Sequence, residues 1–98
     1  MDHKILSSSN DLVKVKCSGS LENTRDLSFM ENIRKDNKSV LLIMEDLDYV
    51  NSCGFGALVE ETMNFDDDKL KVKIKKLEPH VRKTLAILGG EQLLNYLD

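Results

Sequence analysis

The feature that most constrains this chain is the stretch 42–56, where a strand pattern changes within a few residues into a helix pattern. Residues 40–44 are entirely apolar and are followed by acidic side chains, whereas residues 51–54 are small and largely polar. Beyond them, the apolar residues recur at the three- and four-residue spacing of one helix face: Phe55, Leu58, Val59 and Met63, with Thr62 between them. The pattern predicts a buried strand, a short turn and a helix from about Ser52 to Asn64.

Ser52 is the polar side chain that this arrangement singles out. The first backbone N–H groups of a helix have no partner within the helix, and the helix dipole is positive at that end. A serine at this position can cap those groups, or it can carry a phosphate that they stabilise. The sequence alone leaves both roles of Ser52 open, a cap or a phosphorylation switch.

Length and composition predict one small cytoplasmic domain over residues 1–98. The chain carries a net charge of -3, which does not favour nucleic-acid binding. No apolar run approaches the roughly 20 residues that a membrane span needs. Its two cysteines, Cys17 and Cys53, form no short-spaced pair, and the first residues lack the apolar core of a signal peptide. Both observations favour a reduced, cytoplasmic protein.

The remaining segments predict an α/β domain with a partly parallel sheet. The expected strands cover residues 4–8, 12–17, 40–44 and 70–75, and the expected helices cover residues 23–35, 52–64 and 79–88. We expect a turn at 19–23, a loop at 66–68, and a central strand at 40–44 that is covered on both faces. The tail 93–97 is either a short helix or a last strand. The side chains expected to be buried include Val13, Val15, Cys17, Leu27, Met30, Ile33, Val81, Leu85 and Leu88.

One face of the predicted sheet is basic, because lysines alternate with apolar residues on two of its strands. These lysines are Lys14, Lys16, Lys71, Lys73 and Lys75. A solvated face that discourages edge pairing explains such a pattern. The alternative is a basic surface for an acidic partner or for lipid headgroups.

No motif for catalysis, nucleotide binding or metal binding is complete. Gly54 and Gly56 lack the third glycine of a dinucleotide loop, which would fall at Val59. His3 and His80 stand apart from other metal-ligating residues, and nothing in the sequence places His80 near a serine nucleophile. We therefore expect no enzyme activity, no metal and no cofactor.

Together these segments resemble a STAS domain, the fold of bacterial anti-sigma factor antagonists. The resemblance spans about residues 10–97. It rests on Gly19-Ser20-Leu21-Glu22, on the run from Leu47 to Leu58, and on Glu78-Pro79-x-Val81 followed by Leu85-x-x-Leu88-Gly89. It implies a small mixed sheet of four to five strands with helices mainly on one face. The final C-terminal helix of many members is expected to be absent.

The resemblance also implies a function, that of a non-enzymatic partner-switching regulator. In that family the serine at the position of Ser52 is phosphorylated by an anti-sigma factor serine kinase, a GHKL-type ATPase, and a PP2C-type phosphatase removes the phosphate. The residues that the resemblance places at the partner surface are Leu21, Asn23, Tyr49, Asn51, Ser52, Cys53, Gly54 and Phe55. Weak homodimerisation is a further expectation.

Two residues depart from the family pattern Asp-Ser-Ser/Thr-Gly-Leu/Phe-Gly. Asn51 replaces the aspartate and Cys53 replaces the second hydroxyl residue. Asn51 keeps the hydrogen-bonding shape of aspartate without its charge, which leaves open whether Ser52 is a substrate for a kinase. The alternatives are a constitutive STAS subunit that braces the ATPase of a phospholipid-transport ABC complex, and a scaffold protomer of a sensory complex.

Overall fold

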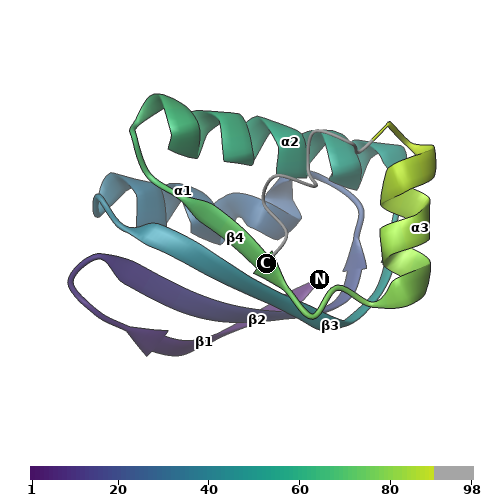
Figure 1. Cartoon of the computed structure of the whole chain (residues 1–98), viewed down its shortest axis with the longest axis horizontal. Coiled ribbons are helices and arrows are strands. Elements are labelled where there is room, and N and C mark those ends of the chain that lie inside the picture. Colours follow the sequence, from purple (N-terminus) through teal and green to yellow (C-terminus); the bar gives the residue numbers. More distant parts are fainter. Residues whose placement is uncertain (90–98) are drawn as a thin grey trace.

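The computed structural model, which describes residues 1–89, contains one four-stranded mixed sheet and three α-helices (Figure 1). The sheet order is β1-β2-β3-β4, in which β1 is antiparallel to β2 and the other neighbours are parallel. In chain order the elements are β1 (Asp2–Ser8), β2 (Leu12–Leu21), the short 3₁₀ helix η1 (Thr24–Leu27), α1 (Ser28–Lys35), β3 (Ser39–Val50), α2 (Ser52–Asp67), β4 (Val72–Lys75) and α3 (Pro79–Ile87).

The helices α1 and α2 lie over one face of the sheet, and α3 stands at one end of it, against β3 (Figure 1). The main core fills the space between these layers, and its fully buried side chains include Val15, Leu42 and Met44 from the sheet and Met30, Leu58 and Phe65 from the helices. The predicted fold class, an α/β domain with a mixed sheet and helices mainly on one face, is confirmed. The tail 93–97 lies outside the described residues.

Most of the predicted buried positions are also confirmed. Cys17 is completely buried, which raises the pKa of its thiol to about 12 and keeps it protonated at neutral pH.

The helix α3 begins with Pro79 at its first position, and Gly89 follows it with a φ of +91°, as expected for a glycine after a helix. Leu88 at the end of α3 is only partly buried.

The predicted turn at 19–23 is wrong, because β2 continues through Gly19 to Leu21. Gly19 has a φ of +84°, and the pairing of β2 with β3 shifts in register directly after it. A glycine with positive φ at such a shift is typical of a β-bulge. The glycine that signals a turn in the sequence therefore bends a strand instead of ending it.

The strand predicted at 40–44 extends much further, because β3 runs from Ser39 to Val50. Its buried side chains continue beyond Met44 as Leu47 and Val50, three residues apart instead of two. Two register shifts between β2 and β3 account for this spacing, since each adds a residue to one strand. The acidic residues that suggested the end of the strand lie between these buried positions and are exposed.

The helix α2 is longer than predicted and is rotated about its axis. It ends at Asp67, so Asp66 and Asp67 form its last turn instead of a loop. Its buried residues are Gly54, Ala57, Leu58, Thr62 and Phe65. Met63 is 58% exposed. Hydropathy alone therefore predicts the wrong buried face for α2. Gly54 and Ala57 are small enough to allow close packing, but they add little to the apolar pattern of the helix.

No described helix covers the second face of the sheet, so the prediction that β3 is covered on both faces is wrong (Figure 1). Leu41 is nevertheless only 9% exposed, and its partners in register are Lys14 of β2 and Lys73 of β4. Long lysine side chains can cover apolar surface with their methylene groups while the charge stays in water. The predicted basic face is confirmed as a shared sheet face with β3 at its centre.

Candidate functional site

The candidate site forms where the carboxyl ends of the parallel strands β2 and β3 meet. Leu21 pairs with Val50 in the sheet, and the backbone N–H of Asn51 donates to the carbonyl oxygen of Leu21 at 3.2 Å. The turn that leads into α2 therefore lies beside the turn that leads into η1. We call residues 21–23 and 49–55 together the Ser52 edge.

Asn51 is the residue that caps α2. Its side-chain oxygen Oδ1 accepts a hydrogen bond from the backbone N–H of Gly54 at 2.8 Å, and its carbonyl oxygen accepts the first helical bond from Phe55. Asparagine and aspartate are equally good at this task, since both present an oxygen at the same position. An aspartate in place of Asn51 would therefore cap the helix in the same way and would add only a charge.

Ser52 is the first residue of α2, and capping is not its role. Its side chain is exposed, and its hydroxyl makes no hydrogen bond within residues 1–89. The neighbouring Cys53 is also exposed and has a free thiol. A phosphate on Ser52 would lie at the positive end of the helix dipole, where such a charge is stabilised.

Two of the residues predicted at the partner-binding surface, Leu21 and Gly54, are buried. They pack against each other within the Ser52 edge. Leu21 is fully buried, and Gly54 packs directly on its carbonyl group and side chain. Phe55 is partly buried against the core. The predicted residues with exposed side chains are Asn23, Tyr49, Ser52 and Cys53, and Tyr49 is 52% exposed.

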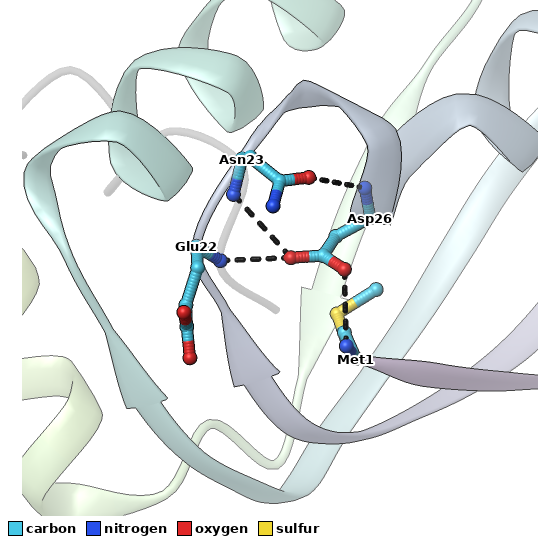
Figure 2. A network of polar contacts seen from close by, with 4 residues as sticks. All are labelled: Met1, Glu22, Asn23 and Asp26. Atoms are coloured by element: carbon cyan, nitrogen blue, oxygen red, sulfur yellow. Dashed lines mark hydrogen bonds and ion pairs between the residues drawn. The ribbon is translucent and has the colours of Figure 1, made fainter.

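A polar network fixes the other half of the edge (Figure 2). The Asp26 carboxylate accepts hydrogen bonds from the backbone N–H groups of Glu22 at 2.9 Å and Asn23 at 3.3 Å, and from the amino group of Met1 at 3.0 Å. In return, the backbone N–H of Asp26 donates to the side-chain oxygen of Asn23 at 3.2 Å. Donation from Glu22 is the main reason why the pKa of Asp26 lies below its usual value.

Asp26 is the site residue that the sequence analysis missed, although a signal was present. Asn23 and Asp26 stand at the three-residue spacing of a capping box, in which each side chain accepts from the backbone of the other. Asn23 caps η1, and the Asp26 carboxylate accepts more hydrogen bonds than the Asn23 side chain does.

We expect the substitution Asp26→Asn to lower the free energy of unfolding at pH 7 by about 1 kcal/mol, the typical value of a capping side chain. Folding lowers the pKa of Asp26 from 3.8, so its contribution is present above that value and is lost as the pH falls through the lower pKa of the folded protein. The difference between wild type and variant should therefore shrink in acid. Urea unfolding followed by circular dichroism at several pH values measures it.

The matched control is Asp67→Asn at the exposed end of α2, which should change stability by less than about 0.5 kcal/mol. A difference for Asp26→Asn that stays constant from neutral to strongly acidic pH would contradict the role given to the carboxylate charge.

Among residues 1–89, no three histidine, cysteine, aspartate or glutamate side chains gather as metal ligands do. Within the same part of the chain, no helix has the length and apolar character of a membrane span.

Comparison with known proteins places this geometry in a family. A family model described as the STAS domain matches residues 2–96. No curated protein sequence matches the chain.

Three solved structures are similar to this one. The anti-sigma factor antagonist SpoIIAA in its unphosphorylated form has a TM-score of 0.71 and 13% identity, over 99% of this chain and 87% of that chain. A variant of RsbS from Moorella thermoacetica has a TM-score of 0.67 and 20% identity, over 88% of this chain and 76% of that chain. The murine Solute Carrier 26 family member A9 anion transporter has a TM-score of 0.70 and 13% identity, over 93% of this chain but only 16% of the transporter. At these identities the similarities show the fold.

Proposed function

Because the chain belongs to the STAS domain family, we propose that it is a partner-switching regulator controlled by phosphorylation of Ser52. In its unphosphorylated form the Ser52 edge binds a serine-kinase anti-sigma factor of the GHKL type. Phosphorylation by that kinase releases the complex, and a PP2C-type phosphatase restores binding. The chain itself performs no catalysis.

The observation that carries this proposal is the state of the Ser52 hydroxyl. It is exposed at the first residue of α2, it makes no hydrogen bond within residues 1–89, and Asn51 already caps the helix. A hydroxyl with a capping role would lose that role on modification. Ser52 has none, so its phosphorylation leaves the fold intact.

The same position makes the phosphate effective at an interface. A phosphoserine adds about -1.5 to -2 charges at neutral pH. Before binding, water and the start of α2 stabilise this charge, which the dipole favours by about 0.3–1 kcal/mol. A partner that covers Ser52 would have to desolvate the charge, and an unpaired buried charge is unfavourable by several kcal/mol. Binding therefore falls while stability does not.

The test is phosphate mapping on the protein purified from its own cells, by intact mass and phosphopeptide analysis. We expect one phosphate, on Ser52, and its disappearance in Ser52→Ala. The matched control is Ser28→Ala, because Ser28 is also an exposed serine at the first position of a helix. Absence of phosphate from Ser52 under all growth conditions, or equal labelling of Ser28, would contradict the proposal.

A further inference from the structure

The face of the sheet opposite the helices carries a concentration of lysine side chains, which we call the outer face. Rows of paired residues cross it. Lys4, Lys16, Ile43 and Lys75 form one row, and Lys14, Leu41 and Lys73 form the next, with Lys71 just before β4. On the other side of the first row, Asp2, Ser18 and Asp46 form an acidic row at the end of the face nearer the Ser52 edge. The residues between them in sequence, such as Val15, Leu42 and Ile74, point into the core. The outer face is thus defined by the pairing of all four strands.

Several lysines on this face have no ion-pair partner within residues 1–89. Lys16 pairs with Asp46 at 2.9 Å and approaches Glu45 at 3.8 Å. By contrast, no acidic side chain within residues 1–89 forms an ion pair with Lys4, Lys14, Lys69, Lys71 or Lys73. These lysines stand out in a chain whose net charge is -3.

Three of the lysines surround a hollow of about 420 Å³ near the amino ends of β3 and β4. Its lining residues are Asp11, Leu12, Ser39, Val40, Lys69, Lys71 and Lys73. Asp11 is the only carboxylate among these lining residues, and it accepts a hydrogen bond from the hydroxyl of Ser9 at 3.2 Å. The hollow therefore carries a positive charge excess.

The side chains of the outer face suit a broad anionic surface as a binding partner better than they suit an amphipathic protein helix. An amphipathic helix needs exposed apolar side chains to pack on, and Leu41, at the centre of the face, is only 9% exposed. Ile43 beside it is partly buried. What the face offers is positive charge from β1, β2 and β4 on both sides of the uncharged residues Leu41 and Ile43 of β3, which matches the multiple negative charges of lipid headgroups.

We propose that the outer face binds the anionic headgroup surface of a phospholipid membrane. Clusters of four to eight basic residues are the size that recognises such surfaces, and each lysine near the surface contributes about a fivefold gain in partition. The helices lie on the other face of the sheet, and the Ser52 edge lies at the carboxyl ends of β2 and β3. Ser52 therefore stays accessible while the outer face contacts lipid.

Sedimentation with vesicles tests the proposal directly on the intact chain. We expect binding to vesicles of phosphatidylglycerol and phosphatidylcholine in equal parts, and none to phosphatidylcholine alone. Binding should be lost in 1 M salt, where the screening length falls to about 3 Å. The double variant Lys14→Gln/Lys73→Gln should bind about 30-fold more weakly. Circular dichroism checks that it is folded.

The matched control is Lys35→Gln/Lys83→Gln, which removes the same charge from exposed sites on α1 and α3. It should keep binding within about twofold of wild type, because these lysines lie off the outer face. Equal weakening by both double variants would show an effect of net charge alone and would overturn the proposal. Failure to bind the mixed vesicles would also overturn it. If the Lys14/Lys73 double variant then lost a protein partner, the face would be assigned to an acidic protein.

Discussion

Replacing Gly54 by alanine should destabilise the protein by about 2–4 kcal/mol, because an added Cβ cannot fit between α2 and β2. It would overlap the carbonyl oxygen of Leu21, and it would lie 2.5 Å from the carbonyl carbon and 2.9 Å from Cγ of that residue. The start of α2 would have to move away from β2. The bond from the Asn51 N–H to the Leu21 carbonyl would then be strained or lost.

The matched control lies two residues further along the same helix. A Cβ on Gly56 meets nothing within 4 Å, so Gly56→Ala should instead stabilise the protein by about 0.5–1 kcal/mol through the better helix propensity of alanine. Thermal unfolding followed by circular dichroism separates the two, since a loss of 1 kcal/mol lowers Tm by about 4–8 °C in a domain of this size. If both variants shifted Tm in the same direction, the close packing at Gly54 would not be the cause.

The second large effect concerns binding and not stability. We expect Ser52→Asp to weaken binding of the proposed serine kinase by at least about 100-fold, the consequence of burying an uncompensated charge at an interface. The free energy of unfolding should stay within about 0.5 kcal/mol of wild type, because an acidic side chain at the start of α2 suits the helix dipole. Titration calorimetry with the kinase and urea unfolding measure the two quantities.

Ser52→Asn is the matched control for this experiment, because asparagine has the size of aspartate and no charge. It should bind the kinase within about tenfold of wild type, since it leaves no charge to desolvate. If asparagine weakened binding as much as aspartate, size would be the cause and the switch would not be electrostatic. If aspartate bound as well as serine, the Ser52 edge would not be the docking surface.

Local patterns predicted much of this fold correctly. The alternation in β2, the apolar run at the start of β3 and the helical spacing after Ser52 each depend on neighbours in sequence, so they indicate the right type of element. The same holds for Pro79 at the start of α3. The errors lie at Gly19 and beyond Met44, where the pairing of β2 with β3 shifts in register. A β-bulge depends on how two strands pair, so the sequence of one strand does not reveal it.

In the candidate site, too, some features follow from the sequence and others only from the tertiary structure. The sequence by itself determined that Ser52 stands at a helix start and that lysines alternate along two strands, since both facts follow from the periodicity of one segment. Only the tertiary structure decided that Gly54 must lack a side chain and that the amino group of Met1 reaches Asp26. Gly54 meets Leu21 because pairing of β2 with β3 brings two distant segments together, and Met1 lies 25 residues before Asp26, so no single segment carries that information.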